Sequence, residues 1–144
     1  MSIPSSRGAR WVFVDSSAYY ALADRHDENY QRATAILTHL GAEQRRLFTT
    51  NFVLAETHSL LLARLGRDNA VRILAGFSKS PATTVIRVKA KDEARAWAII
   101  RMYEDKSFSL IDAISFAVME RLRIPQAFTF DHHFYQYGVT VLDP

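Results

Sequence analysis

Five short apolar runs, separated by longer segments with helical spacing, constrain the fold of this chain most strongly. The runs are rich in β-branched and aromatic residues, as buried strands are. They span residues 11–14, 47–50, 83–88, 127–130 and 139–142, and the helical segments span residues 18–23, 27–40, 52–65, 68–77, 92–103 and 108–119. Strands that alternate with helices form right-handed βαβ units, with parallel strands and helices on both faces. The sequence therefore predicts an α/β fold, a three-layer α/β/α sandwich with a mainly parallel sheet of four to five strands.

Length and composition fit one domain. The chain has 144 residues, of which 49% are hydrophobic, enough to build one continuous core. We expect a single domain over residues 1–144, with a polar N-terminal leader at residues 1–10. This leader lacks the apolar stretch of a signal peptide, and no segment approaches the roughly 18 apolar residues of a membrane span. We therefore expect a cytoplasmic protein.

The segment 108–119 is very apolar, yet it carries one carboxylate, Asp112, near its start. Helix rules offer a simple explanation. Ser109 and Asp112 have the spacing of a capping box, and the positive end of the helix dipole favours an acid in the first turn. A second explanation, a role in metal binding, requires other carboxylates at the same place.

Three other acids are predicted to meet Asp112 at one edge of the sheet. Asp15 and Asp131 directly follow predicted strands, and Glu56 lies about one turn into the helix after the second strand. Ligands of open α/β folds bind at the carboxyl ends of the strands, and the helix that carries Asp112 starts at that edge. Taken singly, Asp15 and Asp131 are equally well explained as helix starters. Glu56 has mostly apolar neighbours, which leaves little polar face for a solvated acid.

Clustered carboxylates need a cation. Two of them about 4 Å apart repel by roughly 1 kcal/mol in water-like surroundings and by about 4 kcal/mol at an effective dielectric constant of 20. The chain has no cysteine, so the possible donors are oxygen and imidazole nitrogen, which favours Mg²⁺ or Mn²⁺. The chemistry expected of such a site is hydrolysis of a phosphodiester by a metal-activated water. A formal net charge of +3 and a sequence pI near 9.4 fit an anionic partner.

Four motifs, in this order, give the chain a family resemblance. They are residues 14–18 (VDSSA), 50–56 (TNFVLAE), 108–113 (FSLIDA) and 128–134 (FTFDHHF). Together they resemble the PIN-domain ribonucleases, specifically the VapC-type toxins of bacterial type II toxin–antitoxin systems. The resemblance implies an endoribonuclease toxin that uses one or two Mg²⁺ or Mn²⁺ ions to cleave RNA. It also implies a homodimer and a cognate antitoxin, whose docking surface we expect around Tyr19, Tyr20 and the helix at residues 52–65.

The same resemblance implies roles for particular residues. The family's acidic quartet, which supplies catalytic residues and metal ligands, falls on Asp15, Glu56, Asp112 and Asp131. Asp15 and Asp112 are the expected direct ligands. Ser16 beside Asp15 and Ser109 before Asp112 are expected to support these ligands by hydrogen bonds.

Some residues beside the acids depart from the family pattern or invite a role of their own. Ile111 precedes the third acid, where Thr or Ala is common, and Phe130 precedes the fourth, where Asn or Asp is common. Neither change removes a carboxylate, but both affect the hydrogen bonds around it. His132 and His133 are possible ligands or acid–base groups, although adjacent side chains point apart, and we do not expect a direct ligand role for either.

Two cations and two alternative functions complete the sequence-based interpretation. Lys106, before the helix with Asp112, and Arg10, before the first strand, are candidates for phosphate binding. One alternative is a phosphatase-like or receiver-like domain in which Asp15 becomes phosphorylated. The other is a catalytically inactive PIN-like scaffold.

Overall fold

A five-stranded parallel sheet forms the centre of the protein, for which a computed structural model describes residues 10–143. The strands are β1 (Trp11–Val14), β2 (Arg46–Thr50), β3 (Thr83–Ile86), β4 (Gln126–Phe128) and β5 (Thr140–Val141), and their order in the sheet is β3-β2-β1-β4-β5. Every neighbouring pair is parallel. The predicted α/β fold is confirmed, with five strands. Residues 1–9 of the predicted leader, which spans residues 1–10, lie outside the described residues.

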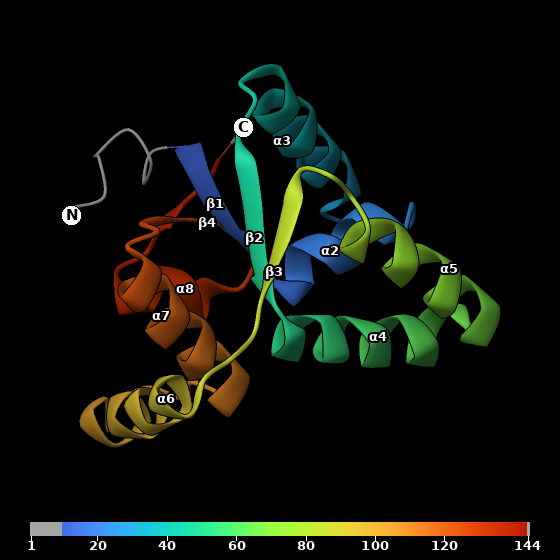
Figure 1. The fold of residues 1–144 in the computed structure, drawn as a ribbon. Helices are drawn as coiled ribbons and strands as arrows, with labels where there is room; N and C mark the ends of the chain where they lie inside the picture. Colours follow the sequence, from blue (N-terminus) through green and yellow to red (C-terminus); the bar gives the residue numbers. More distant parts are fainter. Residues whose placement is uncertain (1–9, 144) are drawn as a thin grey trace.

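Helices cover both faces of this sheet. They are α2 (Ser16–Ala23), α3 (Tyr30–Ala42), α4 (Asn51–Leu65), α5 (Arg67–Ser78), α6 (Ala90–Met102), α7 (Leu110–Leu122) and α8 (His132–Tyr137). Figure 1 shows α2, α3 and α5 on one side of the sheet and α7 and α8 on the other, with α6 outside α7. Helix α4 extends away from the end of β2 and packs against α2 and α5. Among the described helices, none has the length and apolarity that a membrane crossing requires.

The central strand β1 sets the register of the sheet. Val12, Phe13 and Val14 are buried on both faces, as the unbroken apolar run predicts. Val14 lies opposite Phe128 of β4, so both strands end at the same level. The residues that follow β1 and β4 are therefore neighbours, and the backbone N–H of Asp15 donates to the carbonyl of Phe128 at 3.2 Å.

Helix α7 is the most deeply buried helix on its side of the sheet. Every residue from Asp112 to Met119 is buried. Its Phe116 packs edge-on against Phe108 and Phe134, with ring centroids 5.1 and 4.9 Å apart. Since a packed aromatic cluster has few alternative arrangements, the start of α7 is held firmly against the sheet.

Several predicted boundaries are wrong, and side-chain hydrogen bonds explain two of them. The fourth strand ends at Phe128, two residues earlier than predicted, because the N–H of Phe130 donates to the hydroxyl of Ser17 instead of to a strand. The third strand ends at Ile86 because the N–H of Val88 donates to the side chain of Asn51.

Two helix ends also differ from the prediction. Helix α4 begins at Asn51, one residue earlier than predicted, with Thr50 as its N-cap, whose hydroxyl accepts the N–H of Val53. Helix α3 continues to Ala42, two residues beyond the predicted end at residue 40, and the left-handed backbone conformation after the helix falls on Gln44, with a φ of 55°.

The expected docking surface around Tyr19 and Tyr20 is not available. Both side chains are almost fully buried, at 3% and 5% exposure, and Tyr19 packs against Phe77 of α5. Helix α4 does expose one large apolar residue, Leu62. Of the predicted surface, only the α4 part therefore faces solvent.

Candidate metal centre

Four separate elements bring four carboxylates to the carboxyl edge of the sheet. Asp15 follows β1 and caps α2, and Asp131 follows β4 and caps α8. Glu56 lies on α4, and Asp112 is in the first turn of α7. We call these four residues the acidic site. Asp15 interacts electrostatically with Asp112 and Glu56, and Asp131 interacts with the same two acids, so Asp112 and Glu56 link the four carboxylates into one cluster.

Asp15 is the most buried of the four, at 2% exposure. As the N-cap of α2 it accepts hydrogen bonds from the backbone N–H of Ser17 at 3.3 Å and from the Ser17 hydroxyl at 2.8 Å. The hydroxyl of Thr129 donates to the same carboxylate oxygen at 3.0 Å. Burial nevertheless raises the pKa of Asp15 to about 6, and repulsion by Asp112 and Glu56 adds to the rise.

Ser17 and Thr129 also connect the ends of the two central strands. Besides donating to Asp15, the Ser17 hydroxyl accepts the N–H of Phe130 at 2.9 Å. The Thr129 hydroxyl accepts the N–H of Asp131 at 3.0 Å. Two acids that are far apart in the chain are thus held by one network of protein hydrogen bonds. The sequence analysis did not identify either hydroxyl, although each lies within two residues of an acid.

Ser16 supports a different acid from the one expected. Its hydroxyl donates to Glu56 across the gap between α2 and α4, rather than to Asp15. Glu56 is half-buried, and burial raises its pKa above the ordinary value, with further repulsion from Asp112 and Asp131. A glutamate among apolar neighbours on α4 therefore points to the acidic site, as predicted.

Asp112 both helps to cap α7 and belongs to the carboxylate cluster, the two roles that the sequence analysis considered. It forms the predicted capping box: its N–H donates to the Ser109 hydroxyl at 3.0 Å, and the N–H of Ser109 donates to its carboxylate at 3.3 Å. Burial and the charge of Asp131 raise the pKa of Asp112, while the hydrogen bonds from Ser109 and His133 oppose the rise. The cap therefore orients a carboxylate that also faces the other acids.

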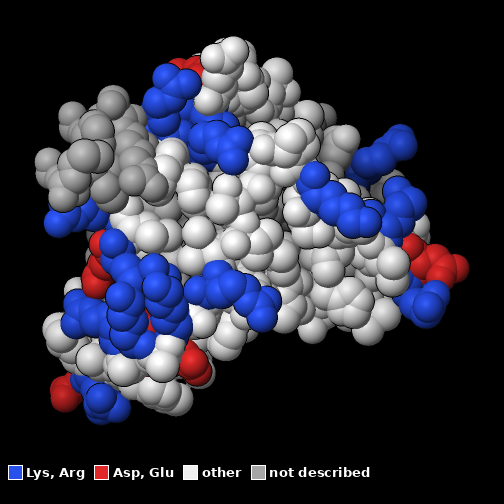
Figure 2. Space-filling view, in the orientation of Figure 1, with Lys and Arg blue, Asp and Glu red and all other residues white. Residues whose placement is uncertain are grey.

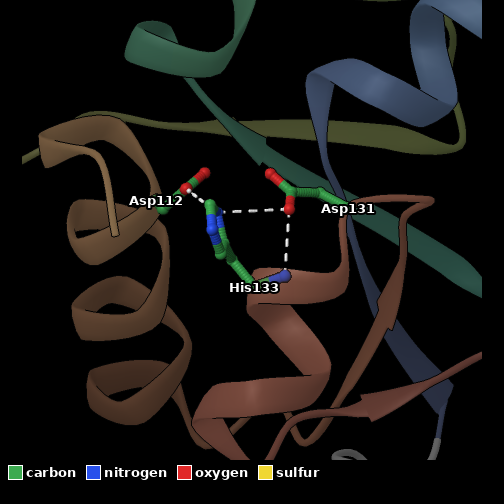
Figure 3. Close-up of side chains that lie close together, drawn as sticks. All are labelled: Asp112, Asp131 and His133. Atoms are coloured by element: carbon green, nitrogen blue, oxygen red, sulfur yellow. Dashed lines mark hydrogen bonds and ion pairs between the residues drawn. The ribbon is translucent and has the colours of Figure 1, made fainter. Parts of the chain in front are cut away.

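His133 lies between two of the carboxylates (Figure 3), which the sequence analysis did not expect. Its Nδ1 is 3.0 Å from Asp112 and 3.3 Å from Asp131. The ring rests against the edge of Phe108, with centroids 5.7 Å apart. His132, in contrast, is 73% exposed, and its Nδ1 is 3.9 Å from Asp131. The signal in the sequence was the position of His133 two residues after an acid that starts a helix, where its backbone N–H can donate to that carboxylate, as it does to Asp131 at 2.9 Å.

The donor set fits a divalent cation. One ligand atom from each of Asp112, Asp131 and His133 lies within 4.8 Å of the other two. Asp15 and Glu56 add carboxylates that carry raised pKa values because they are buried near like charges. Oxygen donors with one imidazole suit Mn²⁺ well and Mg²⁺ when its remaining positions hold water.

The two cations proposed for phosphate binding lie in different places. Lys106 is in the loop before α7, with 29% exposure of its side chain, and is paired with Asp105 at 2.9 Å. Arg10 is exposed and precedes β1, at the opposite edge of the sheet from Asp15. The backbone positions of the two residues are five steps apart along extended chain, about 16 Å, so the placement of Arg10 does not favour contact with a substrate at the acidic site.

The sequence matches the PIN domain family over residues 12–139. It is 32% identical to the 23S rRNA-specific endonuclease VapC20 of Mycobacterium tuberculosis over 133 residues, which are 92% of this chain and 98% of that protein. It is 31% identical to a VapC ribonuclease of Archaeoglobus fulgidus over 116 residues, covering 78% of this chain and 72% of that protein.

Solved structures show the same fold. The crystal structure of M. tuberculosis VapC20, described as a sarcin–ricin loop cleaving toxin, matches with a TM-score of 0.83 and 34% identity, over 92% of this chain and 99% of that chain. The structure of FitAcB from Neisseria gonorrhoeae matches with a TM-score of 0.68 and 18% identity, over 92% and 97% of the two chains. The second similarity extends to the fold alone.

Proposed function

This chain belongs to the VapC-type ribonuclease toxins of the PIN-domain family, and on that premise we propose that its acidic site holds one or two Mg²⁺ or Mn²⁺ ions that cleavage of RNA requires. Asp15, Glu56, Asp112 and Asp131 would hold the cation. The burial of Asp15 among other acids is the observation that carries this proposal, because an ionised carboxylate there lacks a compensating positive charge.

The chain's own residues prepare the site. Ser17 and Thr129 orient Asp15, and Ser109 together with the positive end of α7 orients Asp112. His133 keeps Asp112 and Asp131 on either side of one imidazole nitrogen. A divalent cation held by these residues would lower the pKa of water, so that hydroxide is available as a nucleophile for phosphorus, and would stabilise the leaving oxygen. Carboxylates that are already held in position before the cation and the RNA bind make this chemistry efficient.

We also propose ribosomal RNA as the substrate class. VapC20 is named a 23S rRNA-specific endonuclease, and its structure is described as that of a toxin that cleaves the sarcin–ricin loop. Identity of 32% over 98% of VapC20 supports a shared type of substrate. The basic excess of this chain, +3 overall, fits a polyanion.

Membership of a toxin family supports two further proposals about partners. We propose a cognate antitoxin and a homodimer. The exposed Leu62 on α4 and Val71 on α5 are large apolar side chains that such an interface would cover. Tyr19 and Tyr20 are excluded from it by their burial.

Cleavage by an Asp112→Asn variant tests the proposed function. The amide can still cap α7, so the fold should persist, whereas the site loses a charge. A sarcin–ricin hairpin RNA incubated with Mn²⁺ should be cleaved by the parent protein. The variant should cleave it at least a hundredfold more slowly, which is the typical loss of rate when one group that stabilises the transition state is removed. The matched control is Asp105→Asn, since that carboxylate is exposed and forms a surface ion pair with Lys106. Cleavage by Asp112→Asn at the parental rate would overturn the proposal.

The alternative functions predict different results. An inactive scaffold would show no stabilisation by millimolar Mn²⁺ in a thermal melt. A receiver-like domain would incorporate phosphate on Asp15, but a carboxylate with 2% exposure and three hydrogen-bond donors is poorly placed to reach a phosphoryl donor.

A further inference from the structure

Four cations lie close together in the loop that joins β3 to α6 and in the first turns of α6. They are Arg87, Lys89, Lys91 and Arg95, and all four are exposed. We call residues 87–95 the basic segment. Figure 2 shows Lys and Arg side chains gathered on the part of the surface where Figure 1 places α6. This concentration is local, because acids and bases are nearly balanced over the whole chain, with 15 of the former and 18 of the latter.

The basic segment begins at the same edge of the sheet as the acidic site. The chain leaves β3 at its carboxyl end, and all five strands are parallel, so this end and the end of β1 face the same way. The side chain of Asn51, the first residue of α4, accepts the N–H of Val88 at 2.9 Å. The loop is thereby fixed to the helix that carries Glu56. This contact fixes the backbone between Arg87 and Lys89 at the carboxyl edge of the sheet.

Three of the four cations are not neutralised by protein acids. Arg95 pairs with Glu120 at 3.1 Å. Within residues 10–143, no carboxylate lies in ion-pair range of Arg87, Lys89 or Lys91. The ion-pair partner of nearby Asp92 is Arg121, which binds both of its carboxylate oxygens, at 2.8 and 2.9 Å, and Lys91 interacts with this carboxylate only through its longer-range charge. The segment therefore presents three available positive charges to solvent.

We propose that Arg87, Lys89 and Lys91 bind the phosphates of RNA that flank the bond to be cleaved. This inference rests on the proposed function, because it takes RNA as the polymer at the acidic site. A cluster of carboxylates repels a phosphate backbone, so a substrate needs compensating cations close by, and Lys and Arg side chains supply this through phosphate contacts that are independent of sequence. The segment exposes no large apolar residue, which favours a polyanion over an apolar protein surface.

Salt-dependent binding of RNA tests this surface. The full chain with Asp112→Asn is used so that the RNA stays intact, and the probe is a labelled hairpin RNA that carries the sarcin–ricin loop. The test variant adds Arg87→Gln, Lys89→Gln and Lys91→Gln. The matched control adds Arg67→Gln, Arg72→Gln and Lys79→Gln, which remove the same charge from exposed positions on α5 and just after it. Thermal melts check that both triple variants are folded.

Each phosphate contact contributes about 0.7 to 0.9 to the slope of log K against log salt concentration. The test variant should therefore show a slope shallower by about 2 to 3, which corresponds to binding weaker by roughly a hundredfold or more near 100 mM salt, whereas the control should keep a slope within about one of the starting protein. Equal slopes for the two triple variants would overturn the inference. So would displacement of the RNA by polyglutamate at the same charge concentration, which would indicate an acidic protein as the partner.

The two proposals fail in different ways. If the parent protein cleaves the hairpin with Mn²⁺ but the test variant binds like the control, the basic segment is not the RNA surface and the proposed function stands. If the test variant loses binding but the parent protein never cleaves, the surface stands and the proposed function fails.

Discussion

Replacing Asp15 by asparagine should stabilise the metal-free protein at neutral pH, although it removes a proposed metal ligand. The carboxylate is 2% exposed and has Glu56 and Asp112 as charged neighbours. Three hydrogen bonds from Ser17 and Thr129 all reach one of its oxygens, Oδ2. An asparagine can place its carbonyl oxygen at that position and keep these bonds, while its NH₂ group faces the other acids without repulsion.

The size of the effect follows from the titration of the carboxyl group. A rise in the pKa of Asp15 from 3.8 to about 6 corresponds to about 3 kcal/mol at 1.36 kcal/mol per pKa unit. The folded protein binds this proton more tightly than the unfolded chain. The parent protein therefore loses stability relative to the variant as the pH rises from about 4 through 6. We expect Asp15→Asn to be more stable by about 1 to 3 kcal/mol at pH 8, since some of the charge-assisted strength of the three bonds is lost.

Urea unfolding in EDTA at pH 4 and pH 8 measures this difference. The two proteins should have nearly equal stability at pH 4, where Asp15 is protonated, and should diverge at pH 8. Asp143→Asn is the control, because this carboxylate is 82% exposed and lies 3.5 Å from Arg32 at the surface. Adding Mn²⁺ at pH 8 should stabilise the parent protein and leave Asp15→Asn nearly unchanged.

Two results would refute the reasoning. The first is an Asp15→Asn protein that is less stable than the parent at pH 8 by 1 kcal/mol or more in EDTA. The second is a stability difference that stays the same at both pH values, because an ionised, uncompensated carboxylate would then not be its source.

Three other substitutions test separate parts of the structure. His133→Gln should weaken Mn²⁺ binding about tenfold in thermal-shift titrations and Mg²⁺ binding less, because imidazole suits Mn²⁺ better; an equal loss for both ions would contradict this. Ser17→Ala should lower stability to urea by about 1 to 3 kcal/mol, because the part-buried N–H of Phe130 loses its acceptor and the carboxylate of Asp15 loses one of its three donors. Unchanged unfolding would show that water replaces the hydroxyl. Arg121→Met should destabilise the fold by about 3 kcal/mol, since it leaves the buried Asp92 unpaired, and the loss should shrink at a pH low enough to protonate that acid.

The parts of the site that depend on periodicity could be predicted from the sequence. Asp15 and Asp131 directly follow apolar runs. Because the carboxyl ends of parallel strands lie at the same edge of the sheet, both residues are expected at that edge. Asp112 was identified because a single carboxylate interrupts an apolar helix, and its capping box is local enough to be read from spacing.

The parts that depend on side-chain direction could not be predicted. Ser16 and Ser17 are neighbours of the same type, and only the first turn of α2 decides that Ser17 bonds to Asp15 while Ser16 bonds to Glu56. For His133 the relevant contact, with Asp112, spans 21 residues and depends on the packing of α8 against α7. Tertiary packing of this kind leaves no periodic trace in one sequence.

The hydrogen bonds that Ser17 and Thr129 make with Asp15, Phe130 and Asp131 consist of protein atoms alone. They close when β1 and β4 pair, so the arrangement of these acids is complete as soon as the sheet has formed. Folding of the chain therefore does not require the binding of a cation. On the proposed function, a folded chain without a bound divalent cation would be inactive as a nuclease. Chelation should accordingly silence the protein reversibly without unfolding it.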